Sequence, residues 1–229
     1  MKKNKIVILG AGESGIGTSI LGKKEGFEVF VSDYGKIKKK YKQVLLHHEI
    51  NWEEGVHSET EILGADIVMK SPGIPENTPL VLKLKKKGIR IVSEIEFAAT
   101  YTTATLIGIT GSNGKTTVAT MIHKILKDAG NNVALAGNIG KSFAELVATK
   151  DINQFVLELS SFQLDGTYNF APHIAILTNL SPDHLDRYGN DYEKYIASKF
   201  KIVMNQTSDD YFIYDADDLM INKWISSTT

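Results

Sequence analysis

The strongest constraint on the fold is a unit that occurs twice: an apolar strand pattern, a glycine-rich turn, and a helical pattern. The first copy is "KIVILGAGESGIG", beginning at Lys5, and the second is "ATLIGITGSNGKTT", beginning at Ala104. After each copy, short β-branched runs alternate with helical patterns, which is typical of βαβ units around a parallel sheet. The sequence therefore predicts an α/β protein with two domains, residues 1–95 and residues 96–229.

One of the helices expected in the second domain has a clear apolar pattern, and the series of elements in this domain stops abruptly. Over 115–129, apolar residues recur at helical spacing and predict a single stripe that faces a sheet. The stripe consists of Val118, Met121, Ile122, Ile125 and Leu126. A strand expected over 210–217 is followed only by the short helical pattern "DLMINKWISSTT". We therefore expect the second domain to be incomplete.

Charge and composition narrow the class of partner. Lys and Arg number 26 against 27 Asp and Glu, so no basic field is present to attract nucleic acid or an anionic membrane. The chain has no cysteine, which excludes disulfides, thiolate metal sites and cysteine nucleophiles and fits a reducing compartment. No apolar run is long enough to cross a membrane. These features favour small-molecule partners and a cytoplasmic protein.

The first glycine turn has the spacing of a nucleotide-binding loop. Gly10, Gly12 and Gly15 lie between a strand and a helix, where backbone N–H groups and the helix dipole favour a pyrophosphate. Asp33 ends the next strand, where an acidic residue commonly binds a ribose or base. Three interpretations stay open: a dinucleotide, as in a nicotinamide-dependent oxidoreductase; another nucleoside diphosphate; or glycines that serve only a tight turn. Gly73, in "KSPGIP", either lines the same crevice or belongs to a plain turn.

The second glycine turn departs from the common triphosphate loop, because the position expected to hold its first glycine is Ile109. The amides of Gly111 to Lys115 can still surround phosphate oxygens, Lys115 can reach the β and γ phosphates, and Thr116 can bind Mg²⁺. Glu158 ends an apolar strand, either as a magnesium ligand or as a salt-bridged structural acid.

The segment "TNLSPDHLDRYG" places His184 among charged neighbours, namely Asp183, Asp186 and Arg187. A lone histidine is usually structural, and His184 differs from the others only by this company. The other histidines singled out are interpreted as structural; these are His47, His48, His57 and His173.

Four segments, "TGSNGKTT", "GNIG", "LELSSFQL" and "NLSPDHLDRYG", together resemble the Mur ligases, and within them the D-glutamate-adding branch. The resemblance extends over essentially the whole chain, and the shortened loop is that family's own form. It implies a Rossmann-like UDP-binding domain followed by a P-loop ATPase domain. The family's third, C-terminal domain has no counterpart here, so a truncated and inactive binding fragment is expected.

The resemblance also implies the site residues. Substrate UDP contacts are expected at Gly12, Glu13, Ser14, Gly15, Asp33, Tyr34, Gly73 and Asn138. ATP contacts are expected at Gly111, Ser112, Asn113, Gly114, Lys115, Thr116 and Thr117. Two Mg²⁺ ions are expected on Thr116, Glu158, His184 and a carbamylated Lys199. The implied catalytic residues are Lys115, Glu158, His184 and Lys199.

The reaction implied by the resemblance is ATP-dependent amide formation in peptidoglycan precursor synthesis. The carboxylate of UDP-N-acetylmuramoyl-L-alanine would form an acyl phosphate, which the amine of D-glutamate would then attack; a monomer is expected. One position departs from the family pattern, because the second strand ends in Asp33-Tyr34-Gly35 instead of Asp-Thr-Arg. The uracil contact of that arginine is unassigned, with stacking by Tyr34 or charge from Lys36 as alternatives.

Overall fold

The computed structural model describes residues 3–228, and within this range it contains two five-stranded sheets whose strand pairs are all parallel. This confirms the predicted α/β class. The chain divides into two compact units. The first comprises the chain up to Thr102 together with Lys141–Asp151 and Gly166–Tyr168, and the second comprises the remainder. The boundary expected between residues 95 and 96 falls inside a helix, Glu94–Ala99. In the structure the first unit instead continues to Thr102.

The sheet of the first unit has the order β3-β2-β1-β4-β5. Its strands are β1 (Lys5–Leu9), β2 (Glu28–Asp33), β3 (Asn51–Glu54), β4 (Ile67–Lys70) and β5 (Arg90–Val92). Its helices are α1 (Glu13–Lys24), α2 (Lys39–His47), α3 (Glu59–Ile62), α4 (Pro79–Lys86), α5 (Glu94–Ala99) and α7 (Phe143–Thr149). The strand order reverses beside β1, and the carboxyl ends of strands at such a reversal are where open α/β sheets commonly bind ligands.

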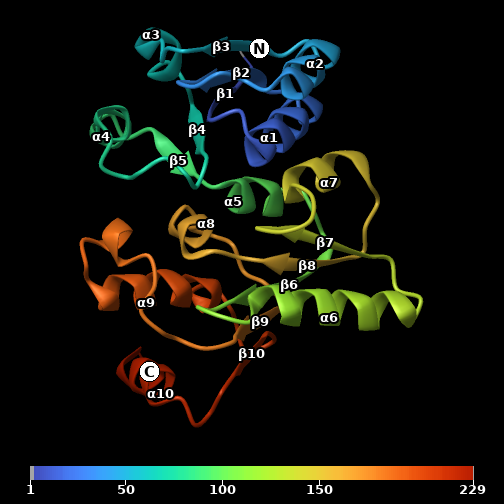
Figure 1. Ribbon diagram of the computed structural model, residues 1–229. Coiled ribbons are helices and arrows are strands. Elements are labelled where there is room, and N and C mark those ends of the chain that lie inside the picture. Colours follow the sequence, from blue (N-terminus) through green and yellow to red (C-terminus); the bar gives the residue numbers. More distant parts are fainter. Residues whose placement is uncertain (1–2, 229) are drawn as a thin grey trace. The chain divides into compact units, whose positions relative to one another are not determined.

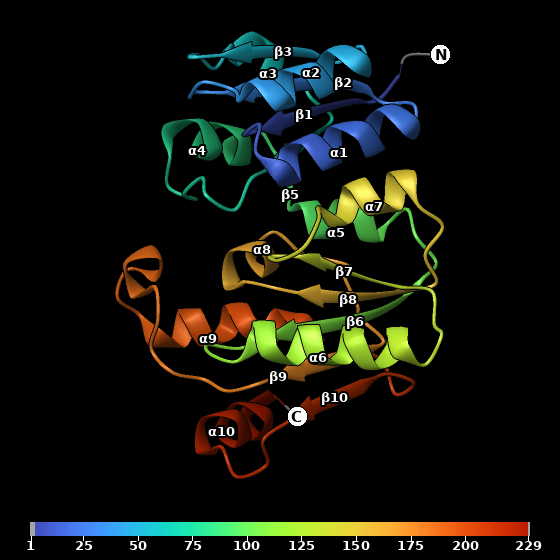
Figure 2. The same cartoon turned by 45° about the vertical axis from the view of Figure 1, so that its right-hand side comes forward.

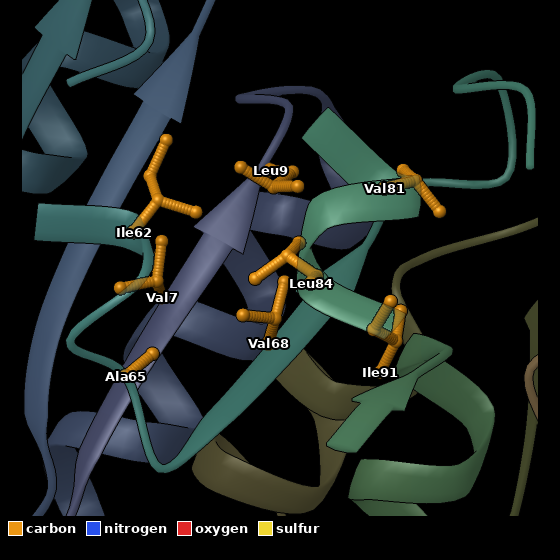
Figure 3. Packing of buried hydrophobic residues seen from close by; sticks show 8 residues of the cluster. All are labelled: Val7, Leu9, Ile62, Ala65, Val68, Val81, Leu84 and Ile91. Atoms are coloured by element: carbon orange, nitrogen blue, oxygen red, sulfur yellow. The ribbon is translucent and has the colours of Figure 1, made fainter. Parts of the chain in front are cut away.

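Both faces of this first sheet are covered, which explains why β1 is a continuous apolar run. Val7 and Leu9 point to one face, where Figure 3 shows them beside Val81 and Leu84 of α4. On the other face, α1 packs so closely that a side chain on Gly22 would lie 3.2 Å from Ile6. Successive side chains of β1 therefore pack alternately against helices on the two faces of the sheet.

A segment from late in the sequence completes the first unit. The carboxylate of Glu94, 1% exposed, accepts hydrogen bonds at Oε1 from the Ser142 hydroxyl (2.5 Å) and from the Ala144 amide (3.1 Å). A Cβ on Gly17 of α1 would lie 1.8 Å from Ser142 Oγ. These contacts with the Glu94 carboxylate and with Gly17 attach Lys141–Asp151 to the first unit. The residues on either side of this segment in the sequence belong to the second unit.

The sheet of the second unit has the order β10-β9-β6-β8-β7. Its strands are β6 (Thr105–Thr110), β7 (Val133–Gly137), β8 (Gln154–Glu158), β9 (Ile174–Leu177) and β10 (Tyr211–Tyr214). Its α-helices are α6 (Lys115–Asp128), α8 (Ser161–Asp165), α9 (Tyr192–Phe200) and α10 (Leu219–Thr228), and its 3₁₀ helices are Leu185–Tyr188 and Lys201–Val203. Central β6 places the second glycine turn between the carboxyl ends of β8 and β9.

Helix α6 lies along the strands of the second sheet, as Figures 1 and 2 show. Val118, Ile122 and Leu126 pack against Ile107, Ile109 and Val156 of the sheet. Met121 and Ile125, however, are 55% and 60% exposed, so the predicted five-residue stripe is wrong in these two members. A helix turns by about 100° per residue, which leaves these two side chains on the margin of the face centred on Ile122.

Within the described residues, no helix combines the length and the apolar content that spanning a bilayer requires.

Candidate functional sites

The turn after β6 has the geometry of a phosphate-binding loop. Gly111 and Gly114 have φ values of +142° and +80°, a region that favours glycine, and α6 begins immediately afterwards at Lys115. The hydrogen bond from Val118 N to Gly114 O (3.0 Å) closes the first helical turn. The N–H groups of residues 115–117 come before that bond and have no acceptor within the helix, so they can donate to a bound anion.

The segment that follows β9 fixes this loop in place. The amide of Ser112 donates to Asn179 O (3.0 Å), and the amide of Asn113 donates to Asn179 Oδ1 (3.0 Å). In return, the carbonyl of Asn113 accepts from Thr178 Oγ1 (2.6 Å). The amide of Ser181 donates to the Ser112 hydroxyl (2.9 Å). Ser112 and Asn113 therefore orient the loop, and they were predicted only as direct contacts to ATP.

Two lysines converge on one carbonyl of the loop. Lys115 Nζ and Lys199 Nζ each donate to Gly111 O at 2.8 Å, and Lys199 is only 2% exposed. Burial first, and then repulsion by Lys115, lower the pKa of Lys199 to about 7. The ammonium group of Lys115 places positive charge at the loop, and its complement is an anion such as a phosphate. Tyr195, one helical turn earlier in α9, places its ring 4.6 Å from Lys199 Nζ.

The carboxylate of Glu158 ends β8 beside the loop and is 2% exposed. Its Oε2 accepts from the Thr116 hydroxyl (2.7 Å), and its Oε1 accepts from the Asn138 side-chain amide (2.8 Å). Both donors are neutral, so the predicted alternative of a salt-bridged acid does not hold. A buried carboxylate and a hydroxyl are the hard oxygen ligands that Mg²⁺ prefers. Thr116 and Glu158 therefore fit one Mg²⁺ ion.

Among the described residues, no hydrogen bond or ion pair joins His184 to Lys115, Glu158 or Lys199. His184 has φ +49° and is 57% exposed, with its ring nitrogen Nε2 3.4 Å from the carboxylate of Asp183 and its ring 5.3 Å from that of Phe162. Within residues 3–228, no cluster of three or more acidic or histidine side chains is arranged to hold a metal. The second ion implied on His184 and Lys199 stays a prediction. Asn138, expected to bind the UDP-substrate, belongs to the second unit, where its side chain contacts Glu158.

The glycine loop of the first unit is tight. A Cβ on Gly15 would lie 1.9 Å from Gly10 O, so α1 begins close against the turn. Gly10 itself has φ +95°. By contrast, Gly12 and Gly73 have no atom within 4 Å of a Cβ position, which leaves open space above both. Glu13 is the first residue of α1, and the hydroxyl of Ser14 lies beside the buried Glu94 carboxyl.

Asp33 fastens the end of β2 to the glycine loop. Its Oδ2 accepts from the amide of Ala11 (2.7 Å), and its Oδ1 accepts from the amide of Gly35 (2.7 Å). The carboxylate thus has a structural role that the sequence did not predict. Its expected contact with a nucleotide stays a prediction. Tyr34, which follows, is 74% exposed.

The structural role of Asp33 gives a stability prediction. Asp33→Ala leaves both amides without their acceptor and should lower the free energy of unfolding by about 1–2 kcal/mol. Asp33→Asn keeps one acceptor oxygen and should recover about half of that loss. Urea denaturation followed by circular dichroism measures both. Equal stability of Asp33→Ala and the unchanged protein would contradict the role.

A hydrogen-bonded group at the ends of β2 and β3 was missed by sequence reasoning. It consists of Ser32, Glu53 and His57, with Ser32 Oγ 2.7 Å from Glu53 Oε1 and 2.6 Å from His57 Nδ1. The ring of His57 lies 5.8 Å from that of Tyr34. The available signal was positional: β2 and β3 are consecutive parallel strands, so polar residues that follow their carboxyl ends come together at one edge of the sheet.

Comparison with known proteins identifies relatives that match both units of the chain. The model of the Mur ligase middle domain matches residues 109–229, and that of the MurD N-terminal domain matches residues 5–80. The UDP-N-acetylmuramoylalanine–D-glutamate ligase of Christiangramia forsetii is 62% identical over 96% of this chain and 50% of the relative. The protein of the same name from Bacteroides fragilis is 57% identical over 96% of this chain and 49% of its own length. The chain thus spans about half the length of these relatives.

Solved structures share the fold at low sequence identity. The ligase for UDP-N-acetylmuramate and L-alanyl-γ-D-glutamyl-meso-diaminopimelate from Neisseria meningitidis superposes with a TM-score of 0.68 at 20% identity, covering 99% of this chain and 75% of that one. UDP-N-acetylmuramate-alanine ligase from Thermotoga maritima superposes with a TM-score of 0.58 at 21% identity, covering 93% and 49%. The two matched domain models together cover both glycine-loop units, and the chain belongs to the Mur ligase family.

Proposed function

We propose that this chain provides the nucleotide-sugar-binding and ATP-binding parts of a ligase that joins D-glutamate to UDP-N-acetylmuramoyl-L-alanine. The observation that carries the proposal is the convergence of Lys115 and Lys199 on Gly111 O, beside the Thr116–Glu158 pair. The names of the relatives supply the substrates. A nicotinamide-dependent oxidoreductase would explain the first glycine loop but would leave this second site without a purpose.

The residues of the second unit suit the activation of a carboxylate by ATP. Lys115 and the amides at the start of α6 neutralise the terminal phosphates, so that the carboxylate of the substrate can attack the γ phosphorus. The bond from this phosphorus to the β–γ bridging oxygen breaks, ADP leaves, and an acyl phosphate forms. Thr116 and Glu158 would hold a Mg²⁺ ion, which supplies further neutralisation of phosphate charge when bound. The amine of D-glutamate then displaces phosphate from the acyl carbon. Positioning and charge account for most of the rate in such a transfer.

Lys199 is proposed to carry the carbamate that the family resemblance implies. A protonated lysine has no lone pair, whereas a neutral one can attack the carbon of CO₂ and release a proton to solvent, which leaves a carbamate anion. The burial of Lys199 and the nearby charge of Lys115 both favour the neutral amine. The resulting anion would offset the charge of Lys115 at the loop.

The Lys115→Ala variant tests the ATP site. We expect it to weaken Mg-ATP binding by about 10-fold to 100-fold, because a charge-assisted contact to phosphate is lost. Isothermal titration calorimetry gives the affinity. Lys124→Ala is the matched control, since Lys124 lies on the same helix and pairs with Asp128 on its exposed face. Equal affinity of Lys115→Ala and Lys124→Ala for Mg-ATP would contradict the assignment.

The substrate side of the proposal is tested with UDP and UDP-N-acetylmuramoyl-L-alanine. Both ligands should bind the unchanged protein. Neither affinity should change in Lys115→Ala, because Gly10, Gly12 and Gly15 belong to the first unit and Lys115 belongs to the second. Added NADH should keep its fluorescence unchanged. Absence of binding by either UDP ligand would reject the proposed function, and a fluorescence change with NADH would favour the oxidoreductase.

A further inference from the structure

The group formed by Ser32, Glu53 and His57, called here the Ser32 relay, has a defined direction of hydrogen bonding. Ser32 is 0% exposed, and its single hydroxyl lies between Glu53 Oε1 (2.7 Å) and His57 Nδ1 (2.6 Å). The amide of Ser58 also donates to Glu53 Oε1 at 2.7 Å. Two short contacts thus share one hydroxyl proton, which Ser32 can donate either to Glu53 or to His57 but not to both.

The charge of Glu53 decides that arrangement. Burial opposes its ionisation, but the hydrogen bonds from Ser32 and Ser58 outweigh burial and hold the pKa of Glu53 below its usual value. An ionised carboxylate only accepts, so Ser32 must donate its proton to Glu53. The oxygen of Ser32 then accepts from His57, which places the ring proton on Nδ1. In the neutral imidazole, Nε2 is consequently left as a hydrogen-bond acceptor.

The Ser32 relay adjoins the glycine loop. The amide of Gly10 donates to the carbonyl of Ser32 (2.9 Å), and the amide of Ala11 donates to Asp33 (2.7 Å). A nucleotide whose diphosphate lies on such a loop has its ribose and base near the end of the second strand. Tyr34 directly follows the last residue of β2, and its exposed ring lies 5.8 Å from the ring of His57.

We propose that His57 selects the base of the bound nucleotide by accepting a hydrogen bond at Nε2 from the ring N–H of uracil, while Tyr34 stacks on the base. Uracil carries a proton on N3, whereas cytosine has an unprotonated acceptor at that atom. Two acceptors facing each other repel, so the site favours UDP over CDP. Ser32 and Glu53 are positioning residues, since they fix the tautomer and do not touch the base. This inference rests on the proposed binding of a UDP-substrate by the first unit.

The affinities of UDP and CDP, measured by calorimetry at about pH 8, test the proposal; this pH lies above the usual titration range of histidine. The unchanged protein should prefer UDP by about tenfold, the value of one well-placed hydrogen bond. His57→Phe keeps an aromatic ring beside Tyr34 but removes the acceptor, so the ratio should fall to near one. Tyr34→Ala should weaken both nucleotides by about tenfold and leave the ratio intact. His48→Phe, a substitution at the end of α2, is the control and should change neither.

The outcomes separate this inference from the proposed function. Equal binding of UDP and CDP by the unchanged protein, or an unaltered ratio in His57→Phe, overturns the role of His57 but leaves diphosphate binding in place. Failure of both nucleotides to bind overturns the proposed function and the inference with it. Nitrogen NMR of His57 in the ligand-free protein gives a second readout: a proton on Nδ1 supports the relay, and a proton on Nε2 overturns it. Ser32→Ala should mix the two tautomers and reduce the UDP preference.

Discussion

Gly111→Ala is expected to destabilise the second unit by about 3 kcal/mol and to abolish measurable ATP binding. Gly111 has φ +142°, which L side chains rarely adopt, and its Cβ would lie 2.0 Å from Thr178 Oγ1 and 3.1 Å from Thr178 N. The strained backbone and the clash act together. Relief of either would move the carbonyl of Gly111, on which Lys115 and Lys199 converge. Urea denaturation measures the stability, and calorimetry with Mg-ATP measures the binding.

Gly130→Ala provides the matched control for that experiment. Gly130, just beyond α6, also has positive φ (+84°), but no atom lies within 4 Å of its Cβ position. Its substitution should cost only about 1 kcal/mol, the price of a left-handed conformation alone, and should leave ATP binding unchanged. If both variants lost the same stability and both bound ATP, the close approach between Gly111 and Thr178 would have no functional importance.

Motifs that follow strands were the part of the site that the sequence could predict. Glu158 pairs in register with Ile109, which is one residue before the end of β6, so a carboxylate ending β8 necessarily lies beside the second glycine turn. The same reasoning applies to Thr178 and Asn179, directly after β9, and could have identified them. His184 lies farther along the same segment. Strand register constrains the first residues after a strand and loses that constraint along a loop.

Contacts made across long sequence separations could not be predicted. The attachment of Lys141–Asp151 to the first unit depends on Glu94, a charged residue whose burial no local pattern indicates. The polar strand β3, "NWEE", likewise lacks an apolar alternation, because it is the edge strand of its sheet. The Ser32 relay combines both difficulties. It joins the end of a buried strand to polar residues at and beyond an edge strand, and only the tertiary structure brings them together.

Lys199→Met is expected to change how stability depends on pH. The folded pKa of about 7 lies below the ordinary lysine value, so between these two pH values the unfolded chain binds more protons than the folded one. The free energy of unfolding of the unchanged protein should therefore rise with pH relative to Lys199→Met. The gain should be about 2–3 kcal/mol between about pH 7 and pH 9, at about 1.4 kcal/mol per pH unit. Below about pH 6 the difference between the two proteins should be constant, because Lys199 is then protonated in both the folded and the unfolded state.

Bicarbonate distinguishes carbamate formation from simple deprotonation. Urea denaturation is first performed in CO₂-free buffer and then repeated with added bicarbonate. Because a ligand that binds only the folded state stabilises it, bicarbonate should raise the stability of the unchanged protein but not that of Lys199→Met. Lys201→Met, which retains Lys199 and removes a neighbouring lysine that is 31% exposed, should respond like the unchanged protein. A pH-dependent gain without any response to bicarbonate would mean that Lys199 loses its proton at the loop but remains an amine, and the carbamate would be rejected.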